Sequence, residues 1–201
     1  MTRWAFVADV HGNFRALARA EALAREGGVE RFVALGDVLG RGQPAECVAW
    51  VRANAALAVV GNRDLDHLGL VSPADQAYLR SLPREATADD FLVTHGDAKL
   101  TPALASADER RGFRRAYAAL LAADRRLWFF GHTHHARVWR KAASDAAPER
   151  LASARIQVEP ADPAVRYLVN VGTTGRRLAG RGPASFTLYD SVAGWLVRVE
   201  L

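Results

Sequence analysis

The stretch Trp4-Ala-Phe-Val-Ala8 is followed at once by Asp9-Val10-His11, so a short apolar run ends in two side chains of metal-binding type. Four later stretches repeat this arrangement: Phe32-Val-Ala-Leu35 before Gly36-Asp37, Leu57-Ala-Val-Val60 before Gly61-Asn62-Arg63-Asp64, Phe91-Leu-Val-Thr94 before His95, and Leu127-Trp-Phe-Phe130 before Gly131-His132-Thr133-His134. Short apolar runs bounded by Gly and Asp predict buried strands. Since open α/β sheets bind ligands at the carboxyl ends of their strands, we expect these side chains to form one site.

Helices are predicted between these strands. Asn13 is a suitable cap for a helix reaching about Glu26, Pro44 opens a second that ends near Asn54, and Ser72 caps a third that begins at Pro73. A fourth, rich in arginine, is expected over roughly 108–126. Its inward-facing residues are expected to be Phe113, Tyr117, Leu120 and Leu121. The segment 97–107 between strand and helix is expected to be a loop.

After residue 135 the pattern changes from alternating strands and helices to strands alone. The expected strands are 136–140, 154–158, 167–171, 185–189 and 195–199. The polar segment 141–150 is expected to be an exposed hairpin loop or a mobile tip. This change predicts two sheets within one domain that spans residues 1–201.

Composition narrows the class of protein. Half of the 201 residues are hydrophobic, so a large core can form. No apolar run reaches about 18 residues, so we expect no membrane span, and the absence of a leader-like N-terminal segment favours the cytoplasm. The single cysteine, Cys47, excludes an internal disulfide and a cysteine-rich zinc site, and we expect it to be buried.

The formal charge is +5 and the sequence pI is about 10, which raises the question of nucleic-acid binding. Lys99 and Lys141 are the only lysines, and the arginines are dispersed along an alanine-rich chain. A compositional bias toward Arg and Ala explains this better than a binding surface. Nucleic acid therefore stays a possible partner that the sequence does not favour.

The ordered set Asp9-x-His11, Gly36-Asp37, Gly61-Asn62-x-Asp64, His95 and Gly131-His132-x-His134 resembles the calcineurin-like metallophosphoesterases, in particular their small bacterial and archaeal phosphodiesterase branch. Each motif alone is weak, but all five in this order, each after an apolar run, are highly specific. They span residues 9 to 134. The resemblance implies a four-layer αββα sandwich, in which two mixed β-sheets are flanked by helices.

The donor chemistry agrees with this resemblance. Carboxylates, imidazoles and an amide without a thiolate suit manganese, iron or zinc. Seven donors are too many for one four-coordinate zinc, but they suit two ions about 3.5–4 Å apart that share a carboxylate. The resemblance implies that one ion is bound by Asp9, His11 and His134, the other by Asn62, His95 and His132, with Asp37 bridging the two. We expect two divalent ions, Mn²⁺ being favoured and Fe, Zn or Ni possible.

The resemblance also implies an activity. A metal-bridging hydroxide would attack phosphorus in line and hydrolyse a phosphodiester bond in a nucleotide or another small phosphate ester. The expected catalytic residues are Asp37, Asn62, Arg63 and Asp64, and Asp64 is expected to hold the third motif in place. A phosphomonoesterase, a dinucleoside polyphosphate hydrolase and a non-catalytic protein-binding scaffold on the same fold are the alternatives. The sequence leaves the oligomeric state open.

Arg63 departs from the family pattern, because many members carry histidine between the Asn and the acidic residue. Arginine cannot act as an acid near pH 7, but its guanidinium can bind phosphate through two hydrogen bonds. The proton for the leaving group would then come from His67, Asp64 or a metal-bound water. We therefore expect a bias toward substrates with stable leaving groups.

A last motif, Asn170-Val-Gly172-Thr173-Thr174-Gly175, resembles a turn that lies on the active-site side in the small phosphodiesterase branch. A tight turn that requires glycine explains the same residues equally well.

Overall fold

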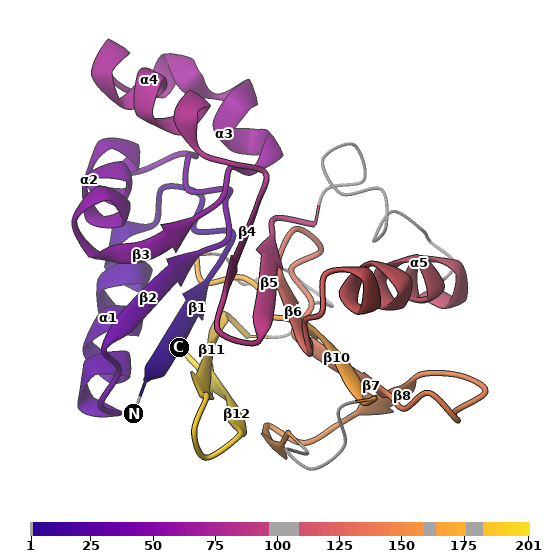
Figure 1. Ribbon diagram of the computed structural model, residues 1–201. Helices are drawn as coiled ribbons and strands as arrows, with labels where there is room; N and C mark the ends of the chain where they lie inside the picture. Colours follow the sequence, from indigo (N-terminus) through magenta and orange to yellow (C-terminus); the bar gives the residue numbers. More distant parts are fainter. Residues whose placement is uncertain (1, 97–108, 159–163, 176–182) are drawn as a thin grey trace.

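The computed structural model describes residues 2–96, 109–158, 164–175 and 183–201, and within them the strands form two six-stranded sheets (Figure 1). The first sheet has the order β3-β2-β1-β11-β12-β9. Its strands are β1 (Arg3–Val7), β2 (Arg31–Ala34), β3 (Ala55–Ala58), β9 (Arg155–Gln157), β11 (Ser185–Asp190) and β12 (Trp195–Glu200). The second has the order β4-β5-β6-β10-β7-β8. Its strands are β4 (Glu85–Ala88), β5 (Phe91–Thr94), β6 (Leu127–Phe130), β7 (Arg137–Lys141), β8 (Glu149–Leu151) and β10 (Arg166–Asn170).

Helices cover the outer face of each sheet, so the layers run α, β, β, α (Figure 1). Helices α1 (Phe14–Glu26) and α2 (Pro44–Asn54) pack on the first sheet, and α5 (Glu109–Ala122) packs on the second. The main core lies between the sheets, where Phe6 stacks on Phe129 at 3.8 Å between ring centroids. The four-layer sandwich of two mixed sheets is thus confirmed.

The predicted helix starts are confirmed in detail. The Asn13 side chain accepts a hydrogen bond from the backbone N–H of Ala16, which satisfies a free donor in the first turn of α1. Ser72 does the same for α4 (Pro73–Ser81). Pro44 and Pro73 occupy the first turns of their helices, where a missing N–H costs nothing.

All five apolar runs contribute strands, and their direction decides where the site forms. Strands β1, β2 and β3 are parallel in the first sheet, and β5, β6 and β10 are parallel in the second. β3 begins and ends two residues earlier than the predicted strand 57–60, next to a register irregularity in its pairing with β2. The carboxyl ends of the parallel strands therefore open onto one edge of the sandwich.

The structure adds to the expectations from sequence and corrects some of them. The C-terminal strands, whose sheet the sequence analysis did not assign, divide between the two: β7, β8 and β10 join the second and β9, β11 and β12 the first. Strands β4 and β8 and the helix α3 (Asn62–Asp66) were not predicted. Leu121 is 47% exposed, because it follows the buried Leu120 around the helix and lies off the inward stripe. The expected loop 97–107 lies outside the described residues.

The burial of Cys47 and the character of the helices bear on two expectations from composition. Cys47 is fully buried, as predicted, and burial raises the pKa of its thiol to about 12. In the described part of the chain, no helix combines the length and the apolar character that crossing a membrane requires.

Candidate metal centre

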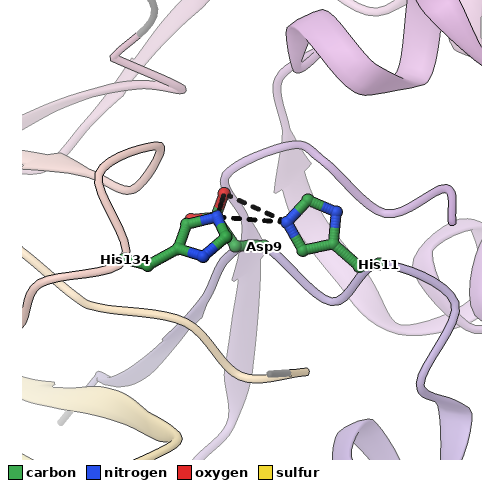
Figure 2. Close-up of side chains that lie close together, drawn as sticks. All are labelled: Asp9, His11 and His134. Atoms are coloured by element: carbon green, nitrogen blue, oxygen red, sulfur yellow. Dashed lines mark hydrogen bonds and ion pairs between the residues drawn. The ribbon is translucent and has the colours of Figure 1, made fainter. Parts of the chain in front are cut away.

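Three of the predicted ligands meet where β1 and β6 end (Figure 2). The Nε2 atom of His134 lies 3.0 Å from Oδ1 of Asp9, and Nε2 of His11 lies 3.8 Å from the same oxygen. The two Nε2 atoms are 3.1 Å apart. Asp9 and His11 come from the first sheet and His134 from the second, so this cluster joins the two halves of the sandwich.

The remaining predicted ligands surround His95, which follows β5. Its Nε2 atom lies 3.4 Å from Oδ2 of Asp37, 3.1 Å from Oδ1 of Asn62 and 3.3 Å from Nδ1 of His132. Asp9, Asp37 and His95 form a second group of possible ligands, so Asp9 belongs to both groups. The structure thus brings all seven predicted ligands together. The sharing of Asp37 between two ions stays a prediction.

The residues present fit a divalent cation. Oδ1 of Asp9 is buried and has no hydrogen-bond partner, although ring nitrogens of His11 and His134 point toward it (Figure 2). A buried carboxylate oxygen without a partner is costly, and a cation among these atoms would remove that cost. Mixed nitrogen and oxygen donors are the chemistry of manganese, iron and zinc sites.

The backbone of five of the seven predicted ligands adopts a conformation that non-glycine residues rarely take. The φ angles are 53° at Asp9, 51° at His11, 53° at Asp37, 65° at His132 and 60° at His134. This left-handed region is unfavourable for residues with a Cβ, and it persists only where the surroundings enforce it. The enforcing contacts include hydrogen bonds from His11 N to Asp37 O at 2.9 Å and from His132 N to Asp9 Oδ2 at 2.8 Å.

Two glycines permit the close approach of the ligand segments. A Cβ on Gly131 would lie 2.5 Å from Oδ2 of Asp9, and a Cβ on Gly61 would overlap the backbone nitrogen and side chain of Asp37. The glycine that precedes the ligands in these motifs is therefore required by packing between strand ends.

Asp64 anchors the site without facing it. One of its oxygens accepts the backbone N–H groups of Val38 and Leu39, and the other accepts those of Asp37 and Gly61, all at 2.8–3.0 Å. The side chain is fully buried. Burial, with the nearby charge of Asp37, raises the pKa of Asp64 to about 6 against the effect of the N–H groups. The structure places this residue in a supporting position, which leaves His67 and a metal-bound water as candidate proton donors.

Electrostatics couple Asp37 to His95. Burial alone would lower the pKa of His95, but the hydrogen bond to Asp37 and the charge of Asp9 raise it to about 9. Burial alone would raise the pKa of Asp37, but His95 and the N–H of Arg63, 2.7 Å from Oδ1, lower it. Burial lowers the pKa of His11, so its neutral form, which can bind a metal, is favoured.

The ligands open into a pocket of about 840 Å³. Among the ligands that line it are His11, Asp37 and Asn62, whereas Asp9 and His95 lie fully buried. Other lining residues are Asn13, Arg41, Gln43, Arg63, His67 and Gly175. Sequence reasoning missed Arg41 and Gln43, for which the only signal was the glycine-rich loop that follows Asp37.

The turn at 170–175 supports the site through hydrogen bonds. The hydroxyl of Thr173 donates to the backbone oxygen of Asp9 at 2.9 Å, and Asn170 Nδ2 donates to Thr133 Oγ1 at 2.9 Å. The Asn13 amide donates to Gly175 O at 2.7 Å. This turn therefore lies next to the site and holds two segments in place, the one that carries Asp9 and His11 and the one that carries His132 and His134.

Comparisons with known proteins agree with this geometry. The model of the calcineurin-like phosphoesterase superfamily domain matches residues 3–193. The chain is 38% identical over 66 residues to the uncharacterized protein MJ0912 of Methanocaldococcus jannaschii, a stretch that covers 32% of this chain and 27% of that protein. A metallophosphoesterase structure from Sphaerobacter thermophilus aligns with a TM-score of 0.76 at 27% identity, over all of this chain and 88% of the other. A novel archaeal phosphodiesterase aligns over the whole of both chains, with a TM-score of 0.58 at 14% identity, and shows likeness of fold alone.

Proposed function

Because this chain belongs to the calcineurin-like phosphoesterase superfamily, we propose that it hydrolyses phosphodiester bonds of a nucleotide or another small phosphate ester with the help of two divalent ions. One observation carries the proposal: nitrogen and oxygen donors from five strand ends converge beneath an open pocket, around a buried carboxylate oxygen that has no hydrogen-bond partner. Mn²⁺ is the favoured ion, and Fe, Zn or Ni are possible.

When bound, the ions would acidify a water molecule and neutralise charge on the phosphate oxygens. The protein supplies the arrangement. Asp9 and Asp37 bring the only ligand carboxylates, and Asn62 adds a neutral oxygen, so the loaded site keeps a positive charge that attracts phosphate. Arg63 lines the pocket, and its backbone N–H donates to Asp37, so its guanidinium would bind a phosphate oxygen of the substrate. Asp64 fixes the loop that carries Asp37.

Three other functions are compatible with the family. A phosphomonoesterase or a dinucleoside polyphosphate hydrolase would use the same ligands and differ in the shape of the pocket. A protein-binding scaffold would have no need for a complete donor set in which five of seven residues have strained backbone conformations. The complete donor set therefore favours an enzyme over a scaffold.

A small-molecule partner and a cytoplasmic location are parts of the same proposal. The free, buried Cys47 is consistent with that location.

The test is metal-dependent turnover. Protein stripped of metal should be inert toward bis(4-nitrophenyl) phosphate and regain activity with Mn²⁺, and Asp37→Asn should abolish that recovery. Rates on 4-nitrophenyl phosphate, which has the same leaving group, distinguish diesterase from monoesterase. A folded protein that binds metal yet stays inactive with Mn²⁺, Fe²⁺, Zn²⁺ and Ni²⁺ on both esters would refute the proposal and favour the scaffold.

A further inference from the structure

A second guanidinium, that of Arg41, lines the same pocket as Arg63 but comes from a different element. Arg41 belongs to the loop between β2 and α2, and that loop is packed tightly on the segment of His11. Gly12 N donates to Val38 O at 2.9 Å, Gln43 N donates to Gly12 O at 2.8 Å, and a Cβ on Gly12 would lie 2.7 Å from Arg41 O. The residue after a predicted metal ligand therefore fixes the backbone that presents Arg41.

Neither guanidinium at the pocket has a partner within the described residues. No hydrogen bond or ion pair joins the side chain of Arg41 or Arg63 to another described group. Some surface arginines are paired with carboxylates, as Arg3 is with Asp190 at 3.1 Å and Arg52 with Asp75 at 3.0 Å, whereas no such contact in the described part of the chain neutralises the two at the pocket. The pocket arginines keep their full charge available for a ligand.

The charges around the pocket exceed what one phosphodiester can balance. Asp37 is the only carboxylate among the described residues that line the pocket, and it would bind the ions together with the buried Asp9. Two divalent ions would outweigh these two carboxylates and one hydroxide, and Arg63 would add a further positive charge. A diester brings one negative charge, so Arg41 is a surplus cation at a pocket that is large enough for a nucleotide.

We propose that the substrate carries a second phosphate group in addition to the ester that is cleaved, and that Arg41 binds this second group. The inference rests on the proposed phosphoesterase function and specifies its substrate class. Arginine suits this role because its planar fork binds two phosphate oxygens at once and stays charged at every physiological pH.

A pair of chromogenic substrates that differ only in the second phosphate tests the proposal. These are thymidine 5′-(4-nitrophenyl phosphate) with and without a 3′-phosphate, and diadenosine tetraphosphate adds an arm in which the extra phosphates are in an anhydride. With Mn²⁺, Arg41→Gln should raise KM by about 10–100-fold in whichever arm the site recognises, because charged hydrogen bonds are lost. KM for the ester without the 3′-phosphate should change less than about twofold.

A binding measurement separates this inference from turnover. Calorimetry should show that wild type binds thymidine 3′,5′-bisphosphate or diadenosine tetraphosphate more tightly than thymidine 5′-monophosphate, and that Arg41→Gln removes the preference. Arg19→Gln, which removes an exposed arginine of α1 outside the pocket lining, is the matched control and should behave as wild type. Equal affinity of wild type for all three ligands, or an equal effect of Arg41→Gln on all substrates, would overturn the inference. Absence of hydrolysis of any ester would instead refute the proposed function, and the binding comparison would still decide the role of Arg41.

Discussion

At the scale of single residues, the site is built from conformations that the chain would not adopt by itself. Asp9, His11 and Asp37 all have left-handed backbones, as do both histidines that follow β6. Each such residue costs of the order of 1–3 kcal/mol, so the fold must supply compensating contacts. The geometry that results directs nitrogen and oxygen atoms at one another instead of at solvent, and a bound cation would stabilise this arrangement.

Metal binding should release a proton from His95. Burial acts against the charged imidazole, but Asp37 and Asp9 raise the pKa to about 9, so at pH 7 the metal-free protein carries a protonated His95. A metal must displace that proton, so its apparent affinity should rise by about tenfold per pH unit up to about pH 9. Calorimetry at pH 7 in buffers of different ionisation enthalpy measures the release. His95→Gln should abolish it, and a wild-type affinity that stays constant from pH 7 to 9 would contradict the assignment.

Arg63 should determine how strongly the enzyme depends on the leaving group. Its guanidinium binds phosphate but cannot donate a proton near pH 7, whereas histidine can. Arg63→His should therefore raise the ratio of kcat/KM for an alkyl phosphodiester to that for a 4-nitrophenyl diester by about tenfold or more. Arg63→Gln is the control, since it removes phosphate binding without adding an acid and should leave the ratio unchanged. The explanation fails if Arg63→His also leaves this ratio unchanged.

At the scale of elements, the site depends on how loops are fastened to one another beyond the strand ends. The short helix α3 has only five residues and little stability of its own. Asp64 fastens it to the loop after β2 by accepting three backbone N–H groups of that loop, including that of Asp37, and it also accepts the N–H of Gly61 at the start of α3. Two ligand-bearing segments that are distant in sequence are thus held at a fixed separation.

Asp64→Asn should destabilise the protein although the two side chains have almost the same shape. The amide nitrogen would face two backbone N–H donors, and those donors would lose their acceptor in a fully buried position. We expect a loss of about 3 kcal/mol in the free energy of unfolding, measured by urea denaturation of the metal-free protein. Asp66→Asn changes an exposed residue of the same helix and should have little effect. A stability for Asp64→Asn equal to that of Asp66→Asn would show that the buried carboxylate is not needed.

The elements also show what the sequence can and cannot predict. The five apolar runs predicted strands because their length and flanking glycines are local signals, and the caps Asn13 and Ser72 are equally local. α3 was missed because its anchor is a contact between residues more than twenty positions apart. The division of the C-terminal strands between two sheets was missed because short strands carry no local information on their partners. Arg41 was missed because an arginine between glycines has no pattern that marks a pocket.

At the scale of the whole molecule, the site lies across the junction of the two sheets. Asp9 and Asp37 follow strands of the first sheet, and His95 and His134 follow strands of the second. The sheets otherwise meet through the apolar core, in which Phe6 and Phe129 stack. Bound ions would therefore add a polar connection at the edge of an interface that is held elsewhere by burial of apolar surface.

Metal removal should consequently lower the stability of the whole fold, and not only the activity. A ligand present at about a hundred times its Kd stabilises the folded state by about 2.7 kcal/mol, which for a chain of this size corresponds to a Tm difference of about 5–10 °C. Differential scanning calorimetry of chelator-treated protein, with and without added Mn²⁺, measures this difference. Asp9→Asn should show little response to Mn²⁺, because Asp9 belongs to both ligand groups. Equal Tm values for wild type with saturating Mn²⁺ and without it would mean that the ligands from the two sheets do not hold a common ion, since an ion that binds only the folded arrangement must stabilise it.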